Sequence, residues 1–398
     1  MEKAVNVKLK ESAIKKIAKG YPLISKHVLQ NPAVLKEEGT IIRLTDGNGR
    51  FIAKGYYGRQ NKGLGWILTH EEHEEIDQDF FNKKLQHAVG RRASFYKSED
   101  TTAFRIFNGE GDGIGGLIIE CFDGHYVIHW YSQGIYAFRE LVLNALKQAA
   151  DVKSIYQKRR FDSKGQYVED NDFVWGQEPE FPLIVKENGE QFAIYLNDGA
   201  MVGVFLDQRD VRRTIRDKYA KRKTVLNLFS YTGAFSVFAA KGGALKTTSV
   251  DLANRSMPKT REQFEINGIE PEEQNIVVMD VFQYFKYAKR KNLAFDLVIM
   301  DPPSFAKSKK VIFSAEKDYT DLLKQAIDIT EDDGIIVAST NASSFDMKKF
   351  RTFIDTAFKE KGSSYQVLEQ FSLPEDFKTI KEFREGNYLK VLFIKKMR

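Results

Sequence analysis

The residues with the clearest potential for chemistry are Asp301, Pro302 and Phe305, within the stretch Asp-Pro-Pro-Ser-Phe. The apolar residues 297–300 before it are typical of a buried strand. Because the two prolines have no N–H to donate, they end the strand in a stiff loop that offers carbonyl acceptors. In open α/β sheets, loops at the carboxyl ends of strands bind ligands. Acceptors beside an aromatic ring suit a flat ring with an exocyclic amine, such as a nucleobase removed from its stack.

A second group of residues, further upstream, has the pattern of a nucleoside site. Residues 225–231 read as a strand, which Thr232, Gly233 and Ala234 end in a turn of small residues, and a later strand-like run ends at Asp251. In doubly wound folds such a turn brings the backbone close to the ligand, and the acidic residue binds the ribose hydroxyls. The turn has one glycine instead of the three that a pyrophosphate needs. This favours S-adenosylmethionine over a dinucleotide and speaks against the alternative of a nicotinamide oxidoreductase.

Several short stretches are similar to one known family. They are residues 203–209 (GVFLDQR), 227–233 (NLFSYTG), 250–251 (VD), 301–305 (DPPSF) and 110–118 (EGDGIGGLI). On these stretches the whole chain resembles the bacterial 23S ribosomal RNA methyltransferases, a class I S-adenosylmethionine-dependent family whose best-known member makes 5-methylcytosine. The resemblance implies S-adenosylmethionine as cofactor, S-adenosylhomocysteine as product and ribosomal RNA as substrate. The strand ends and the resemblance together indicate these cofactor-binding residues: Phe205, Gln208, Arg209, Phe229, Tyr231, Gly233, Asp251, Leu252, Asp280, Val281 and Asp301.

The expected reaction depends on a cysteine that is missing. Family members that methylate cytosine attack the base with a thiolate located after the fifth strand, and the corresponding residues 335–343 hold no cysteine. The one cysteine, Cys121, lies far upstream in an apolar strand-like run, where we expect a buried structural thiol. The placement of Asn341 after the fifth strand instead resembles the guanine-methylating half of a fused bacterial enzyme, which needs no cysteine. We therefore expect direct transfer to a guanine nitrogen, which mainly requires donor and acceptor to be aligned. The candidate catalytic residues are Asp301, Pro302, Phe305 and Asn341. Cytosine C5 methylation remains an alternative, as does a non-catalytic RNA-binding protein that retains the cofactor fold.

Positive charge is concentrated at the N-terminus. The formal net charge of the chain is +6, and residues 1–72, with 13 Lys and Arg against 7 Asp and Glu, account for all of it. Aromatic residues, among them Tyr21, Tyr56 and Trp66, lie between these charges. A basic segment on a neutral body indicates a grip on RNA phosphates. Its strand-like runs predict a small β-barrel, and the resemblance implies a PUA-like fold for it. These runs are residues 5–9, 40–44, 51–57 and 65–68.

The order of elements predicts an α/β chain of three domains. We expect a PUA-like RNA-binding β-barrel over residues 1–72 and a small α+β domain over 73–188. For residues 189–398 the resemblance implies a class I methyltransferase domain with a Rossmann-like, seven-stranded sheet. In this last segment strands and amphipathic helices alternate. No helix is expected between the final strand-like runs, 365–373 and 390–395, which predicts an antiparallel closing pair.

Composition and spacing exclude several other classes. A single cysteine gives no disulfide framework and fits the reducing cytoplasm. The N-terminus lacks an apolar signal region, and no apolar stretch reaches the roughly 18 residues of a membrane span. The histidines of residues 70–73 are three apart, unlike the zinc-protease motif, so no metal is expected. Residues 111–116 fit G-x-G-x-x-G but run into a strand, which predicts a glycine-rich hairpin. No heptad or apolar stripe indicates self-assembly, and a homo-oligomer stays open.

Overall fold

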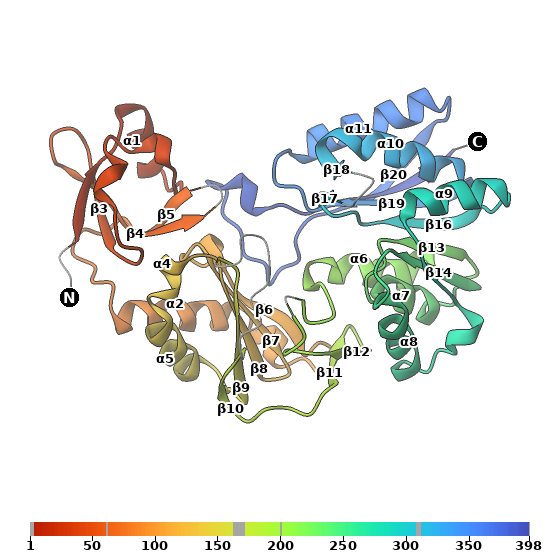
Figure 1. The fold of residues 1–398 in the computed structure, drawn as a ribbon, viewed down its shortest axis with the longest axis horizontal. Helices are drawn as coiled ribbons and strands as arrows, with labels where there is room; N and C mark the ends of the chain where they lie inside the picture. Colours follow the sequence, from red (N-terminus) through yellow and green to blue (C-terminus); the bar gives the residue numbers. More distant parts are fainter. Residues whose placement is uncertain (1–3, 61–62, 162–171, 200, 308–311, 398) are drawn as a thin grey trace. The chain divides into compact units, whose positions relative to one another are not determined.

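The computed structural model describes residues 4–60, 63–161, 172–199, 201–307 and 312–397 (Figure 1). The chain divides into two compact units. The first consists of Met1–Val185, Tyr195–Val202 and Glu375–Gly386. The second consists of Lys186–Ile194, Gly203–Pro374 and Asn387–Arg398. The chain therefore passes from one unit to the other several times, and neither unit is a single continuous segment.

The basic N-terminal segment forms the first sheet of the first unit. Its spatial order is β1 (Val5–Lys8), β3 (Ile41–Thr45), β4 (Phe51–Gln60), β5 (Gly63–Thr69) and β2 (Leu23–Ile24). The helix α1 (Glu11–Ala18) packs against β4. The carboxylate of Asp46 accepts hydrogen bonds from the backbone N–H groups of Asn48 and Arg50, both at 2.9 Å, and so closes the turn between β3 and β4. The four predicted strands are confirmed, whereas α1 and β2 were not expected.

The second sheet of this unit is formed by the middle of the chain. Its order is β10 (Phe173–Gly176), β9 (Ser154–Arg159), β8 (His125–Trp130), β7 (Leu117–Phe122) and β6 (Ala103–Asn108). The helices α2 (Gln78–Arg91) and α5 (Arg139–Ala149) cover one face (Figure 1). Short helices α3 (Ala93–Tyr96) and α4 (Gln133–Tyr136) connect these elements. Tyr56 and Trp66 of the N-terminal segment pack in the same core cluster, so the two sheets share apolar contacts. The predicted boundary at residue 72 stays a prediction.

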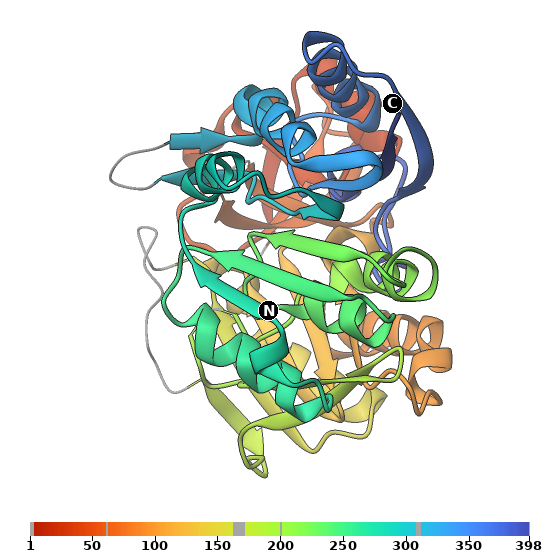
Figure 2. The same cartoon turned by 90° about the vertical axis from the view of Figure 1, so that its right-hand side faces the viewer.

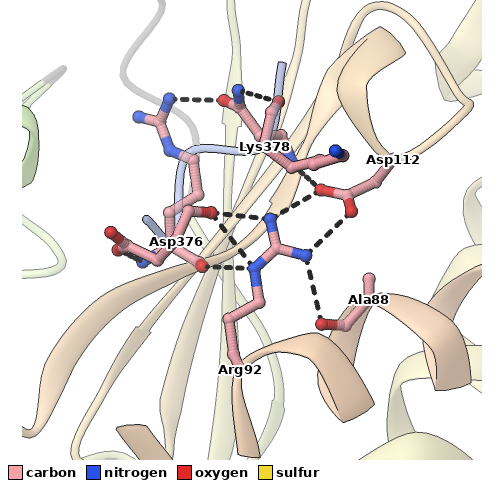
Figure 3. Close-up of polar contacts among 7 residues, drawn as sticks. Ala88, Arg92, Asp112, Asp376 and Lys378 are labelled. Atoms are coloured by element: carbon pink, nitrogen blue, oxygen red, sulfur yellow. Dashed lines mark hydrogen bonds and ion pairs between the residues drawn. The ribbon is translucent and has the colours of Figure 1, made fainter. Parts of the chain in front are cut away.

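A segment from the C-terminal part of the chain packs in the first unit. The buried guanidinium of Arg92 donates to both carboxylate oxygens of Asp112, at 2.8 and 2.7 Å, and to the carbonyl oxygen of Asp376, at 3.1 and 2.6 Å (Figure 3). A Cβ at Gly111 would lie 1.8 Å from the carbonyl oxygen of Lys378, so only glycine permits this approach. The glycine-rich stretch leads into β7, as its sequence predicted, and it also serves close packing, which the sequence did not predict.

The second unit contains a seven-stranded sheet. Its order is β15 (Asn275–Val278), β14 (Lys246–Asp251), β13 (Thr224–Leu228), β16 (Phe295–Met300), β19 (Thr330–Thr340), β21 (Lys390–Lys396) and β20 (Tyr365–Phe371). The first five strands are mutually parallel, and β21 is antiparallel to both β19 and β20. This confirms the expected sheet and its closing pair.

Helices cover both faces of this sheet (Figures 1 and 2). One face packs against α9 (Val281–Arg290), α10 (Ala315–Asp328) and α11 (Met347–Glu360). The other packs against α6 (Arg209–Thr214) and α7 (Ala234–Lys241), with α8 (Ser256–Ile266) beside α7. Along β13, Leu226 and Leu228 point to the first cluster and Val225 to the second, because side chains alternate along a strand. Apolar residues are therefore needed on both sides, which explains the nearly continuous apolar runs.

Two local predictions differ from the structure. β13 ends at Leu228, earlier than expected, because Phe229 and Tyr231 have φ angles of 59° and 52° and leave the extended conformation. Phe305 does not lie in a loop. It begins the strand β17 (Phe305–Lys307), which pairs with β18 (Ile312–Ser314). A further two-stranded sheet, β11 (Leu183–Glu187) and β12 (Glu190–Ile194), precedes the large sheet in the chain.

Candidate active site

The structure places the predicted site residues at one edge of the second unit. They follow the carboxyl ends of its parallel strands, with the exception of a segment before α6. In strand order they are Asp280 and Val281 after β15, Asp251 and Leu252 at β14, Phe229, Tyr231 and Gly233 after β13, Asp301, Pro302 and Phe305 after β16, and Asn341 after β19. Residues that are up to 112 positions apart in the sequence therefore share one edge of the sheet. The carboxyl edge of an open parallel sheet is where α/β proteins bind ligands.

The turn after β13 has an unusual backbone. Phe229, Tyr231 and Gly233 all have positive φ, the last at 79°. A Cβ at Gly233 would lie 2.5 Å from the Cγ2 atom of Thr260 on α8. Only glycine fits there, and the chain passes directly from it into α7. The positive φ angles and the close contact with α8 explain why this turn needs glycine at residue 233, and its approach to a nucleoside stays a prediction.

Asp251 supports this turn. Its Oδ2 atom accepts a hydrogen bond from the backbone N–H of Tyr231 at 2.9 Å, and its Oδ1 atom accepts one from Ala253, also at 2.9 Å. A carboxylate oxygen can accept more than one hydrogen bond, so both retain capacity for ribose hydroxyls. The next side chain, Leu252, is 59% exposed at the same edge. An acidic acceptor followed by an exposed apolar surface fits the adenosine part of the cofactor.

Asp280 and Val281 have clear structural roles. The carboxylate of Asp280 accepts a hydrogen bond from the backbone N–H of Gln283 at 3.1 Å and caps α9. The side chain of Val281 is buried in the core between the sheet and its helices. Contact of these two residues with the adenine stays a prediction, and for Val281 it would have to involve the backbone.

The segment before α6 lies against the turn. The hydroxyl of Thr232 donates to the carbonyl oxygen of Gly203 at 2.7 Å, and the ring of Phe205 lies 5.2 Å from that of Tyr231. Phe205 is 43% exposed, whereas Arg209, the first residue of α6, is buried. This segment is thus held beside the turn after β13, and Gln208 within it also contacts Ser339 of β19.

A hydrogen-bond chain joins three distant stretches beside Asp301. The Gln208 Nε2 atom donates to Ser339 Oγ at 2.7 Å, and Ser339 Oγ donates to Asp301 Oδ1 at 2.8 Å. Burial raises the pKa of Asp301 to about 6; the hydrogen bond from Ser339 opposes this rise, and the nearby charge of Asp207 adds to it. Asp301 is therefore a carboxyl group whose charge is set by its surroundings, a property frequent at functional sites.

The remaining predicted residues follow the same strand ends: Pro302 and Phe305 come after β16, and Asn341 comes after β19. Phe305 is 61% exposed, Asn341 is exposed and Pro302 is buried. The loop that carries Asn341 is held by Lys390, whose Nζ atom donates to the carbonyl oxygen of Ala342 at 2.8 Å. Burial lowers the pKa of Lys390 to about 8. An exposed ring and an exposed amide at neighbouring strand ends are side chains that can contact a base, and this contact stays a prediction.

Ser339 and Lys390 were not among the site residues that the sequence predicted. Ser339 is a buried polar residue at the end of an apolar parallel strand, and this contrast is the signal that could have identified it. Cys121, by contrast, was interpreted correctly. It is 3% exposed in the core of the first unit, and burial raises the pKa of its thiol to about 11.

Within the described residues, no group of three or more His, Cys, Asp or Glu side chains is placed to hold a metal ion. A search of the same part of the chain finds no helix with the length and apolar character required to cross a membrane.

Comparison with known proteins agrees with this geometry. Residues 132–393 match the family described as S-adenosylmethionine-dependent methyltransferase, and residues 7–70 match the PUA-like domain. The chain belongs to the S-adenosylmethionine-dependent methyltransferases. It is an enzyme of that class, with S-adenosylmethionine as its cofactor and a PUA-like domain at its N-terminus.

Three proteins are similar to this chain over most of its length. The Bacillus subtilis protein named "Putative ribosomal RNA large subunit methyltransferase YwbD" is 59% identical over 390 residues, which are 98% of each chain. "Ribosomal RNA large subunit methyltransferase I" of Aeromonas salmonicida is 29% identical over 360 residues, 90% of this chain and 91% of the relative. A crystal structure of "a putative methyltransferase complexed with SAH" has a TM-score of 0.91 and 37% identity, and covers 98% of this chain and 100% of the other. The family resemblance is thereby confirmed along the whole chain.

Proposed function

We propose that this enzyme methylates a base of large-subunit ribosomal RNA in the cytoplasm, by direct transfer to a guanine nitrogen. The names of the two curated relatives support the substrate class. The observation that carries the choice of guanine is the lack of a thiol. Residues 189–398 contain no cysteine, and Cys121 is buried in the core of the first unit. A route through a covalent thiolate adduct on cytosine has no nucleophile in the candidate site.

In this proposal the side chains hold the two reactants and do little chemistry themselves. S-adenosylmethionine supplies an electrophilic methyl group bound to a sulfonium. Asp251 would hold the ribose, and the segment with Phe205, Gln208 and Arg209 would hold the methionine part. Asp301 and the carbonyl group of Pro302 would orient the base. Alignment of an in-line displacement can provide most of the acceleration, so the absence of histidine after residue 129 is no obstacle.

Phe305 would stack on the base. Its ring is exposed, and a stacking contact of an aromatic side chain with a base is worth about 1–3 kcal/mol. Asn341, exposed on the neighbouring strand end, would contact the edge of the same base. The basic segment 1–72 would bind RNA phosphates. On α1 and beside it, Lys10, Lys15 and Lys19 are exposed to solvent.

The test is to identify the modified nucleotide. Ribosomal RNA from cells that lack the protein would be digested and analysed by mass spectrometry, and the purified enzyme would then be supplied with labelled S-adenosylmethionine and that RNA. We expect one methylated guanosine to be missing from the cells and to be restored in vitro. Loss of a 5-methylcytidine instead would establish the cytosine alternative. RNA binding without any methylation would leave the chain a binding protein.

The variant Cys121→Ser tests the reaction mechanism without changing a residue of the candidate active site. Cys121→Ser should keep near-normal methylation, and RNA that contains 5-fluorocytosine should not trap a covalent complex. A stable adduct that disappears in Cys121→Ser would contradict direct transfer.

A further inference from the structure

Ser339 connects two parts of the candidate site, and none of the sequence motifs contains it. It is 1% exposed, accepts a hydrogen bond from Gln208 Nε2 and donates one to Asp301 Oδ1. A hydroxyl group has a single proton to donate. Because Ser339 donates it to Asp301, the Gln208 amide must turn its nitrogen toward Ser339 and its oxygen away.

This orientation of the Gln208 amide leaves its oxygen, Oε1, without a hydrogen-bond partner in the described part of the chain. Gln208 is 2% exposed, and its Oε1 atom is buried with no hydrogen-bond partner among the residues that the structure describes. A buried acceptor without a partner is unfavourable. If the amide were reversed, Oε1 would face Ser339 and could accept its proton. Asp301 would then have to be protonated to donate to Ser339 in turn. The direction of donation along the hydrogen bonds from Gln208 through Ser339 to Asp301 is therefore coupled to the charge of Asp301.

Charged and titratable groups from the surrounding elements act on Asp301. The carboxylate of Asp207, just before α6, disfavours a second negative charge and itself accepts a hydrogen bond from the Tyr388 hydroxyl at 2.9 Å. Arg212 on α6 favours the charge, but both its Nε and Nη2 atoms are 2.7 Å from carboxylate oxygens of Glu187.

From the opposite face, the hydroxyl of Tyr319 on α10 donates to the carbonyl oxygen of Ser339 at 2.8 Å. This bond holds the backbone of Ser339 and leaves its side-chain hydroxyl for Asp301. Burial raises the pKa of Asp301 to about 6, while the hydrogen bonds from Ser339 and Gln208 lower it. The two neutral donors therefore help to decide whether Asp301 is charged at neutral pH.

We propose that Ser339 and Gln208 are positioning residues that keep Asp301 ionised and orient its carboxylate toward the N–H groups of the target base. This rests on the proposed function. The Watson–Crick edge of guanine has two adjacent donors, the ring N1–H and the exocyclic amine, which match a carboxylate. Cytosine has one amine beside a ring acceptor, which a carboxylate disfavours. An ionised Asp301 thus selects guanine, whereas a protonated Asp301 loses one of its acceptor positions.

The experiment compares variants of the hydrogen-bond chain with a matched control. Ser339→Ala and Gln208→Met remove the donors, and Ser339→Thr restores the hydroxyl. Ser249→Ala is the control, because Ser249 on β14 is also a buried serine in a side-chain hydrogen bond, at 2.7 Å to Ser236. Two quantities are measured. The first is the titration of the Asp301 carboxyl carbon by ¹³C NMR, assigned by its loss in Asp301→Asn. The second is the pH profile of methyl transfer to ribosomal RNA.

In Ser339→Ala and Gln208→Met we expect the titration of Asp301 and the acidic limb of kcat to move upward together, by about one pH unit. In Ser339→Ala the KM for S-adenosylmethionine should change little, whereas Gln208→Met is also expected to raise it, because Gln208 is a proposed cofactor contact. Ser339→Thr should restore the profile, and Ser249→Ala should not move it. An Asp301 titration that is unchanged in Ser339→Ala, or shifted equally by Ser249→Ala, overturns the proposal. If the titration shifts while the wild-type enzyme methylates no ribosomal RNA, the proposed substrate is wrong and the positioning role stands.

Discussion

Replacement of Arg92 by methionine should release the segment of residues 375–386 from the first unit. Arg92 lies at the end of α2 and is 1% exposed. It donates to Asp112, to the carbonyl oxygen of Asp376 and to the carbonyl oxygen of Ala88, the last at 3.1 Å (Figure 3). Methionine has a similar length but no donors, so it removes the charge and these hydrogen bonds while it fills much of the same space.

The expected loss of stability in Arg92→Met depends on the Asp112 carboxylate, which stays buried without its partner. The side chain of Asp112 is 2% exposed and keeps a hydrogen bond from the backbone N–H of Asn108 at 2.8 Å. Removing one partner of a buried ion pair costs about 3–5 kcal/mol, because the other charge stays buried without compensation. We expect Arg92→Met to lie in that range. Replacing Asp112 by leucine in the same protein should recover part of the loss, because the uncompensated charge is then gone.

Unfolding in denaturant and hydrogen exchange of the backbone amides test this prediction. The free energy of unfolding should fall as stated, and the backbone amides of residues 375–386 should exchange faster. The control is Lys153→Met, which breaks an ion pair with Asp123 whose side chains are 53% and 44% exposed, and which should cost at most about 1 kcal/mol. If Arg92→Met costs no more than this control, or if exchange in the segment is unchanged, the assignment of Arg92 as its anchor is refuted.

Three further predictions concern ligand binding and pH. Asp251→Ala should weaken S-adenosylmethionine binding by about 1–3 kcal/mol, since the ribose hydroxyls and the N–H of Tyr231 lose their acceptor; unchanged binding in calorimetry would remove Asp251 from the cofactor site. Changing Lys10, Lys15 and Lys19 together to glutamine should weaken RNA binding and flatten its dependence on salt concentration. Phe305→Ala should instead reduce turnover with little effect on RNA affinity. If the lysine variant and the wild type show equal salt slopes, binding of RNA phosphates by this segment is contradicted. Because the pKa of Asp301 is raised from its usual 3.8 to about 6, its ionisation at pH 7 costs stability, and Asp301→Asn should stabilise the fold by about 1–2 kcal/mol. That advantage should shrink as the pH falls through 6 and vanish near pH 4, and a pH-independent difference in thermal unfolding would argue against it.

The sequence by itself determined the class of the protein and most of its strands. The turn around Gly233, the strand end at Asp251 and the Asp-Pro-Pro motif are local signals, because the backbone conformation of glycine and the missing N–H of proline act wherever these residues occur. The same holds for the burial of Cys121, which its apolar neighbours indicated. Alternation of strands and helices, together with the family resemblance, then predicted the seven-stranded sheet and its antiparallel end.

Tertiary structure alone decided which distant residues meet. No local pattern could show that Ser339 lies between Gln208 and Asp301, because the three residues approach one another only when their strands and the segment before α6 assemble. The anchoring of residues 375–386 by Arg92 is of the same kind, since its partners are up to 284 positions away. The charge of Asp301 likewise depends on burial and on neighbours from other elements. Hydrogen bonds and electrostatic fields act through space, and only the folded chain sets those distances.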